Sequence, residues 1–392
     1  MKQEILLARG SDDGRGAGRD GARGAVLADG ALTDFRAARR ETPSLVGGVY
    51  RARVKKIVPG LAGAIVEIPG GEAWLDLART VSAKPSEGAA LTVQIVQDAQ
   101  AEKLPRAAAE PMIAGRFLAY QPFAAKPALS HRITDNNARA HLGAALAALG
   151  GAGAGHFLAL HRAPEAGDEA LRQEAARLRA MWQGARAVLD AGGAPAEALP
   201  PPDPVLDLLR VFVGPAMTRI AVDSETLAAS TREWLAAHAP EWRGAVEREP
   251  VGRTTLESDS VRAELDAALA PDVALPGGGA LVIAAAAGLT VIDVDTDRAA
   301  AVSAKANFAR VNREAAQAIA RQIRLRNLGG RIVIDFAGLG AARDLPAVVG
   351  ILKGAVAADP MAVQIARPSD FGLVELIRRR ERRTLAEMLG KY

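Results

Sequence analysis

Two short runs of apolar residues in the last third of the chain end in carboxylates. Residues 289–295 read LTVIDVD and residues 331–336 read RIVIDF. Their β-branched content is typical of buried strands. Between them, residues 313–326 repeat apolar positions at helical spacing. The pattern predicts a strand, a crossover helix and a second strand. The polar face of this helix, expected to be exposed, consists of Arg313, Gln317, Arg321 and Arg324.

The leading acids of the two runs, Asp293 and Asp335, lie 42 positions apart. Parallel strands joined by a crossover helix bring their carboxyl ends to one edge of the sheet, where open α/β sheets bind ligands. Two converging carboxylates suit Mg²⁺, which is usually held by one or two acids together with substrate phosphates. Each acid taken singly favours a structural role, because strand-end aspartates often cap turns and helices. As a pair they favour a metal-dependent enzyme acting on phosphodiester bonds.

A set of short strands is expected earlier in the chain, over residues 49–54, 63–68, 72–77 and 90–96. Closely spaced short strands with glycine and proline turns are typical of a small barrel. Tyr50 and Trp74, with Lys55 and Lys56, are similar to the aromatic and basic face with which OB-folds bind single-stranded nucleic acid. The residues alone leave it equally open that Trp74 belongs to the barrel core and that the lysines are solvated.

Composition limits the classes of protein that fit this chain. A length of 392 residues predicts several domains, and the proline-rich residues 200–204 mark a boundary. The absence of cysteine excludes disulfides, thiolate zinc sites and cysteine nucleophiles, and it agrees with a cytoplasmic setting. A net charge of +4 does not by itself indicate nucleic acid. Five arginines within residues 378–383 predict a terminal helix that either faces phosphates or is simply solvated.

The most specific motif is EAAQAIARQIRLRNLGGRIVIDF at residues 314–336, followed by PSDFGLVEL at residues 368–376. With these stretches, with residues 48–74 and, more weakly, with residues 115–122, the chain resembles the ribonuclease E/G family of bacterial endoribonucleases. The resemblance implies a multidomain fold of the α/β and α+β classes. The implied parts are an RNase H-like domain in two segments (1–42 and 203–265), an inserted OB-fold (43–112) and 5′-sensor-like region (113–202), and a DNase I-like catalytic domain (266–392).

The same resemblance implies a function and a set of site residues. Asp293 and Asp335 would be catalytic and hold Mg²⁺, and Asp295 would assist where the family has asparagine. The reaction would be hydrolysis of single-stranded RNA to 5′-phosphate and 3′-hydroxyl ends, in RNA processing or decay, including that of ribosomal RNA. The expected RNA-binding residues are Tyr50, Lys55, Lys56, Trp74, Arg162, Arg321, Arg324 and Arg326.

The sequence also departs from the family pattern. With no cysteine and an end at Tyr392, the chain is expected to be a shortened form without the zinc link and small domain that build the family's tetramer, and a zinc-free monomer or weak dimer is expected. Ala163 stands where the sensor arginine is normally followed by threonine, and Ile65 stands at one aromatic position of the OB-fold. Residues 284–287 are four alanines where the family is polar.

Two alternatives to an endoribonuclease stay open: a noncatalytic RNA-binding paralogue and a DNA nuclease.

Overall fold

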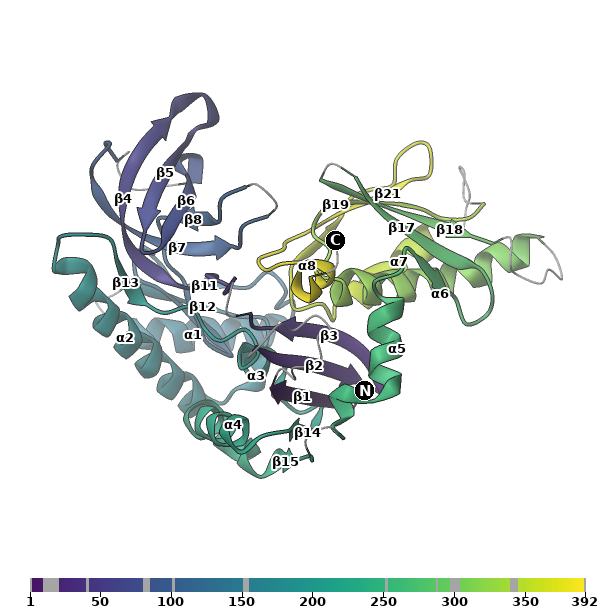
Figure 1. The fold of residues 1–392 in the computed structure, drawn as a ribbon, viewed down its shortest axis with the longest axis horizontal. Helices are drawn as coiled ribbons and strands as arrows, with labels where there is room; N and C mark the ends of the chain where they lie inside the picture. The colour runs from purple at the N-terminus through teal and green to yellow at the C-terminus, as the bar shows by residue number, and fades with distance from the viewer. Residues whose placement is uncertain are drawn as a thin grey trace. The chain divides into compact units, whose positions relative to one another are not determined.

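The computed structural model describes residues 2–9, 21–39, 42–79, 85–100, 103–150, 155–250, 253–286, 288–296, 304–338 and 345–390. The chain forms two compact units. The first comprises Met1–Thr42, Phe212–Leu235 and Glu241–Tyr392, and the second comprises Pro43–Val211 and Ala236–Pro240. Sheets and helices alternate in both units (Figure 1), which confirms the expected multidomain α/β and α+β fold. The finer division into five segments stays a prediction.

A five-stranded sheet, ordered β15-β14-β1-β2-β3, joins the start of the chain to its middle. Its strands are β1 (Gln3–Arg9), β2 (Ala22–Ala28), β3 (Ala31–Ala37), β14 (Met217–Val222) and β15 (Val246–Arg248). β14 runs parallel to β1 and β15, while β1, β2 and β3 form an antiparallel meander. Asp29 and Gly30 take positive φ angles of 48° and 82° in the β2–β3 turn, as a tight Asp-Gly hairpin requires. Helices α4 (Glu225–His238) and α5 (Asp259–Ala267) follow β14 and β15 in sequence.

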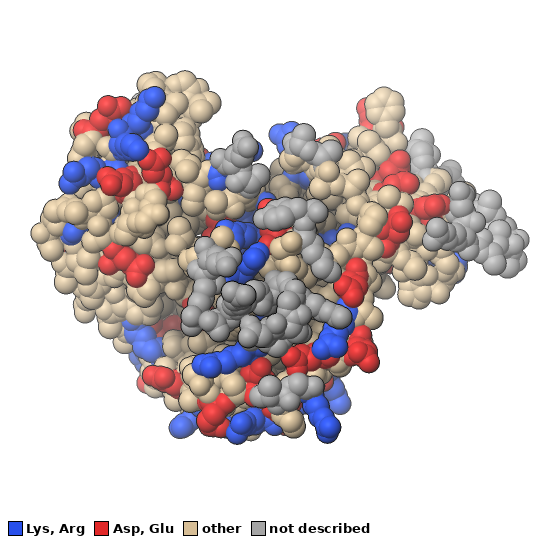
Figure 2. All heavy atoms as spheres, in the orientation of Figure 1, with Lys and Arg blue, Asp and Glu red and all other residues tan. Residues whose placement is uncertain are grey.

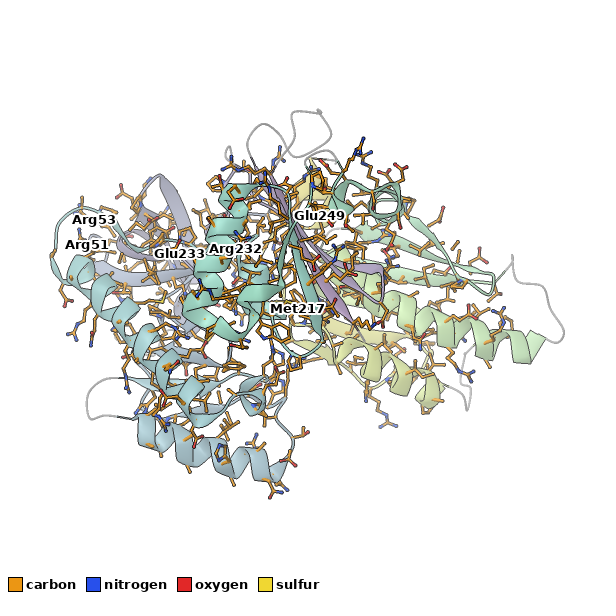
Figure 3. The ribbon with its side chains drawn as sticks, turned by 90° about the horizontal axis from the view of Figure 1, so that it is seen from below. Arg51, Arg53, Met217, Arg232, Glu233 and Glu249 are labelled. Atoms are coloured by element: carbon orange, nitrogen blue, oxygen red, sulfur yellow. The ribbon has the colours of Figure 1, made fainter. Side chains whose placement is uncertain are left out.

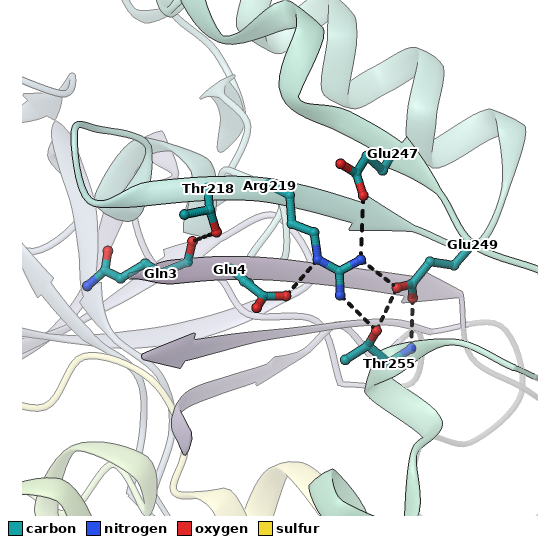
Figure 4. Close-up of polar contacts among 7 residues, drawn as sticks. All are labelled: Gln3, Glu4, Thr218, Arg219, Glu247, Glu249 and Thr255. Atoms are coloured by element: carbon teal, nitrogen blue, oxygen red, sulfur yellow. Dashed lines mark hydrogen bonds and ion pairs between the residues drawn. The ribbon is translucent and has the colours of Figure 1, made fainter. Parts of the chain in front are cut away.

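One ion-pair network fastens the middle of the chain to β1 (Figure 4). Arg219 on β14 lies 2.6 Å from Glu4 of β1, 3.5 Å from Glu247 of β15 and 3.0 Å from Glu249. Its guanidinium also donates to Thr255 at 3.0 Å, and Thr255 bonds Glu249 in turn. A planar fork with several donors suits such a cluster of carboxylates. Arg219 is therefore a structural residue that holds distant segments of the sheet together.

The second unit begins with a closed barrel. Its strands are β4 (Val49–Val58), β5 (Gly63–Ile68), β6 (Gly71–Asp76), β7 (Ala90–Gln97) and β8 (Arg106–Ala108). The pairing of β4 with β7 closes the barrel, and β13 (Ala196–Leu199) adds to the edge of β4. Ala52, Val54, Val66 and Leu75 belong to the interior core. The four strands predicted from the sequence are present, and the OB-like barrel is confirmed.

A small sheet and two helices continue the second unit. The strands, in the order β11-β12-β10-β9, are β9 (Ile113–Ala114), β10 (Leu118–Gln121), β11 (Ala128–Leu129) and β12 (His156–Ala159). The helices are α1 (Asn136–Leu149) and α2 (Asp168–Asp190), and the short α3 (Asp207–Phe212) follows. α2 packs on the sheet through Leu171, Ala175, Leu178 and Trp182, as its amphipathic sequence predicts.

A buried carboxylate holds this small sheet onto α2. Glu174 is 2% exposed and accepts hydrogen bonds from the consecutive N–H groups of Arg116, Phe117 and Leu118, at 2.5, 2.9 and 3.0 Å. Gly115 leaves room for it, because a Cβ there would lie 2.3 Å from a Glu174 oxygen. Charge-assisted bonds from several donors offset the cost of burying a charge.

Glu174→Ala is expected to lower the free energy of unfolding by about 2–3 kcal/mol, because buried N–H donors would lose a charged acceptor. Urea denaturation followed by circular dichroism measures the change. Glu169→Gln, at an exposed position of the same helix, is the control and should stay within about 0.5 kcal/mol of wild type. Equal stability of the two variants would contradict the role of Glu174.

A mixed six-stranded sheet, ordered β16-β17-β18-β19-β21-β20, carries the two carboxylate runs. Its strands are β16 (Asp272–Ala274), β17 (Ala280–Ala286), β18 (Leu289–Asp295), β19 (Gly330–Asp335), β20 (Val363–Ile365) and β21 (Val374–Arg378). β18 and β19 are parallel neighbours joined through α6 (Ala304–Leu325), so the predicted strand–helix–strand unit is confirmed. α6 and α7 (Leu345–Val356) cover one face of the sheet (Figure 1) and share its apolar core. Among the helices of the described ranges, none has the length and apolar character needed to cross a membrane.

Two expectations about arginines are wrong. Residues 378–383 do not form a helix, because Arg378 is the last residue of β21 and the chain turns before the short α8 (Leu385–Leu389). The polar face of α6 is not an exposed row, because part of it packs against β3 of the five-stranded sheet. The Arg324 side chain is only 9% exposed and that of Arg321 is 35% exposed. α6 is therefore covered on both faces near its end.

Candidate functional site

Two facing carboxylates, with a third two residues along, lie on the uncovered face of the six-stranded sheet. Asp293 and Asp335 are Cα partners in the parallel register, and both are exposed. Asp295 lies two residues further along β18 and so on the same face. Figure 2 shows acidic side chains over this part of the surface. Neighbouring strands lie about 4.8 Å apart, so the acids converge at the carboxyl ends of two parallel strands, as the sequence predicts.

The charges of these acids act on one another. Partial burial raises the pKa of Asp293, and the negative charges of Asp335 and Asp295 raise it further. A hydrogen bond from the backbone N–H of Val294 opposes these effects. A divalent cation between the carboxylates would replace their repulsion with attraction. The electrostatics of the site therefore fit a cation.

The donor set fits magnesium. In the described part of the chain, no group of three or more His, Cys, Asp or Glu side chains is arranged to hold a metal by itself. Mg²⁺ does not need such a cage, since it keeps several waters and binds through one or two carboxylates and the phosphates of its substrate. Asp293 and Asp335 would hold it, with Asp295 beside them.

A buried asparagine anchors the loop that follows β19. Asn312 on α6 is fully buried, donates from Nδ2 to the carbonyl of Ala337 at 2.8 Å and accepts from the N–H of Ala337 at 3.0 Å. Ala337 comes two residues after Asp335. Gly338 has a φ of 64°, and a Cβ there would lie 2.6 Å from the ring of Phe308. These contacts fix the direction in which the chain leaves the site.

Small apolar residues of β17 stand beside the acids. Val282 is the Cα partner of Asp293, and Ala284 follows two residues later on the same face. Ala284 and Ala285 are exposed, while the remainder of the four-alanine run lies outside the described side chains. Among the described residues of β17, the side chains next to the carboxylates therefore offer no polar group.

Three arginines expected to bind RNA instead contact protein. Arg321 pairs with Glu264 of α5, and Arg324 pairs with Asp34 of β3. Arg326 is 8% exposed, and burial lowers its pKa to about 10. These side chains attach the end of α6 to the five-stranded sheet and α5, so their guanidinium groups are engaged within the protein.

A row across the outer face of the barrel combines cations with an aromatic ring. In the strand register Lys56 pairs with Ile65, Ile65 with Trp74, and Trp74 with Arg106. Lys56 and Arg106 are exposed, although Arg106 also lies 3.5 Å from Asp76. Trp74 is half-buried with its ring over Gly63, where a Cβ would lie 2.0 Å from it. We call Lys56, Ile65, Trp74 and Arg106 the outer row. Sequence reasoning missed Arg106 because β8, with 3 residues, is too short to show an alternating pattern.

Three other basic or aromatic residues of β4, Tyr50, Arg51 and Lys55, make contacts within the protein. Tyr50 is 2% exposed in the barrel core, and burial raises the pKa of its phenol to about 12, so its ring is not free for stacking. Lys55 is exposed but pairs with Glu72. Arg51 is buried and donates to the carbonyl of Ala194 at 2.8 Å, next to the end of α2 (Figure 3). Among the described residues of the barrel, the outer row therefore combines a partly exposed aromatic ring with exposed cations.

The arginine expected to sense a 5′ end is held by its own region. The side chain of Arg162 is 12% exposed and lies 2.7 Å from Glu165. It also donates to the carbonyl of Val211 at 2.9 Å. A phosphate would have to compete with both contacts, and a role for Arg162 in 5′ sensing stays a prediction.

Comparison with known proteins adds an independent finding. The model of the Ribonuclease E/G family matches residues 112–381. Ribonuclease E of Nostoc sp. is 30% identical over 372 residues, which cover 88% of this chain and 52% of that protein. Ribonuclease G of Salmonella typhimurium is 28% identical over 391 residues, covering 94% of this chain and 79% of that protein. Ribonuclease G of Escherichia coli is 27% identical with the same coverage. The chain thus spans about half the length of the first relative and about four fifths of the other two. The resemblance carried by the sequence motifs is confirmed, and the chain belongs to the ribonuclease E/G family.

Proposed function

We propose that the chain is an endoribonuclease that cleaves single-stranded RNA with Mg²⁺ held by Asp293 and Asp335. Membership of the ribonuclease E/G family supports a hydrolase acting on RNA. The observation that carries the metal-dependent mechanism is the register that sets Asp293 opposite Asp335 on an open sheet face. The setting we propose is RNA processing or decay in the cytoplasm, including that of ribosomal RNA, with the chain acting as a monomer or weak dimer.

The carboxylates and the outer row have separate tasks in this proposal. When bound, Mg²⁺ supplies stabilisation of the charge that develops on the phosphate. Asp293 and Asp335 would hold the ion from two strands, and Asp295 adds negative charge on the same face. The outer row holds the unpaired strand through stacking and backbone contacts.

Hydrolysis breaks the bond from phosphorus to the 3′ oxygen. Water gives its oxygen to the 5′ phosphate and a proton to the 3′ oxygen.

The test incubates the purified chain with a labelled single-stranded RNA and a DNA oligomer of matched sequence. We expect cleavage of the RNA that needs Mg²⁺, stops with EDTA and leaves 5′ phosphates, while the DNA stays intact. RNA that stays intact with Mg²⁺ would overturn the proposal, and so would an Asp293→Asn variant as active as wild type. Equal cleavage of the DNA would favour a DNA nuclease.

A noncatalytic RNA-binding protein is the second candidate. The small apolar residues of β17 beside the acids favour it, because they add no polar support to the site. In that case the outer row would bind RNA and the acids would be structural. RNA binding that weakens with salt but not with EDTA, without cleavage, would support this alternative.

Asn312→Ala is expected to lower the rate of RNA cleavage about 10-fold, because the backbone that Asn312 holds lies two residues after Asp335 and outer contacts of a metal site typically contribute that much. Asn312→Asp keeps the acceptor for the N–H of Ala337 and should retain more activity than the alanine variant. Single-turnover cleavage at a series of Mg²⁺ concentrations separates weakened metal binding from a slower step. Full activity of Asn312→Ala would show that the loop after β19 does not need this anchor.

A further inference from the structure

One phenylalanine is exposed to solvent at the tip of the loop between β20 and β21. Phe371 is 88% exposed, against 70% for Leu61 and 56% for Phe123, the next most exposed large apolar residues among those described. Leaving such a ring unburied forgoes about 1.5–3 kcal/mol of stabilisation. Aromatic side chains make up only 4% of the chain, which makes an aromatic ring at this place noteworthy.

The loop is built to keep Phe371 at its tip. The N–H of Ser369 donates to the carbonyl of Leu373 at 2.9 Å, and the N–H of Gly372 donates to the carbonyl of Ser369 at 2.9 Å. The hydroxyl of Ser369 accepts from the N–H of Leu373 at 3.1 Å. Gly372 has a φ of 85°, a conformation open mainly to glycine. Ser369 and Leu373 therefore donate hydrogen bonds to each other and close the base of the turn.

The register of β21 places this tip beside the carboxylates. β19 and β21 are antiparallel with Ile334 opposite Val374, so Leu373 comes next to Asp335. Neighbouring strands lie about 4.8 Å apart, and two residues span at most about 7 Å. The Cα atom of Phe371 therefore lies within about 12 Å of that of Asp335.

A cation stands in the same loop. Arg367 is exposed, and within the described part of the chain it shows no hydrogen bond or ion pair of its side chain. An aromatic ring together with a cation is the combination that holds an unpaired strand, with the ring on a base and the cation on the backbone. The loop carries both groups at the edge of the proposed active site.

We propose that Phe371 stacks on a base next to the scissile phosphate and that Arg367 contacts the adjoining backbone. This inference rests on the proposed function and adds a residue that determines specificity. A base can stack on the ring only if it is out of a duplex, so the loop selects RNA that is unpaired at that nucleotide. Stacking accepts every base because each has a π-face.

The test measures kcat/KM on a single-stranded RNA and on copies that are abasic at one position near the cut. Phe371→Ala is expected to lower kcat/KM for the intact RNA roughly 5- to 100-fold, whereas Phe371→Trp retains most of it. Phe123→Ala removes another exposed phenylalanine, one that packs on Trp182, and should match wild type. At one of these positions, removal of the base should lower kcat/KM of the wild-type protein by a similar factor. The same removal should not change kcat/KM of Phe371→Ala. Arg367→Ala should lower the salt dependence without changing that abasic pattern.

A binding measurement separates this inference from the proposed function. The Asp335→Asn protein in EDTA is titrated with the same labelled RNAs and followed by fluorescence anisotropy. Weaker binding on adding Phe371→Ala, with the same abasic dependence, supports stacking even if wild type does not cleave RNA. Cleavage and binding that Phe371→Ala leaves unchanged on every substrate would overturn the stacking role, while the endoribonuclease proposal would stand.

Discussion

Asp293→Asn and Asp335→Asn are each expected to reduce cleavage of single-stranded RNA at least 100-fold at saturating Mg²⁺. Each change removes one of the two strand-borne ligands, and a loss of this size is typical when a group that stabilises transition-state charge is removed. The fold should persist, because an amide in either place relieves the repulsion between the carboxylates, which adds to the effect of burial in raising the pKa of Asp293. Single-turnover rates test the first statement and thermal unfolding tests the second.

Asp272→Asn provides a matched control for these variants. Asp272 is exposed and pairs with Val282, which in turn pairs with Asp293, so it lies in the same row across the sheet. Two strand spacings, about 10 Å, separate it from Asp293, which is too far for a shared ion. We expect the control to stay within about twofold of wild type. An equal loss for Asp272→Asn and Asp335→Asn would show that net negative charge, rather than coordination, accounts for the effect.

Local patterns were enough to predict the unit that carries the site. The β-branched runs at residues 289–295 and 331–336 match β18 and β19 closely, since buried strands and a crossover helix are set by neighbouring residues. The right pairing then follows from the topology, because a crossover helix makes the two strands parallel. Asp293 and Asp335 could therefore be placed together from the sequence, although the register that makes them direct partners could not.

The side chains whose expected exposure was wrong depend on distant contacts or on strand parity. Helical periodicity shows which face of α6 is apolar, but not what its other face meets. Arg321 donates to the carbonyl of Leu32 across 289 positions of sequence, and no local pattern reports that. For Tyr50 the sequence does contain a signal of burial. Tyr50, Ala52 and Val54 are spaced two residues apart, so they point to the same face of β4, and all three belong to the barrel core.

Arg378→Met is expected to lower the free energy of unfolding by about 3–5 kcal/mol, because it would leave a buried carboxylate without its partner. Arg378 and Asp359 are each 3% exposed, and Nε of Arg378 lies 2.7 Å from Asp359. The same guanidinium donates to Asn327 at 2.9 Å and to the carbonyl of Leu328 at 2.8 Å. One side chain thus ties the end of β21 to the end of α6. Urea denaturation and thermal unfolding measure the loss.

Two further variants decide whether the buried ion pair causes that loss. Arg379→Met removes the neighbouring arginine, whose side chain is 54% exposed, and should change stability by no more than about 0.5 kcal/mol. Arg378→Met combined with Asp359→Leu should regain much of the stability, because an apolar pair no longer leaves a charge buried. If the double variant is as unstable as Arg378→Met alone, the bonds to Asn327 and Leu328 account for the loss and the ion pair does not. Arg378 would then hold the ends of β21 and α6 together as a hydrogen-bond donor.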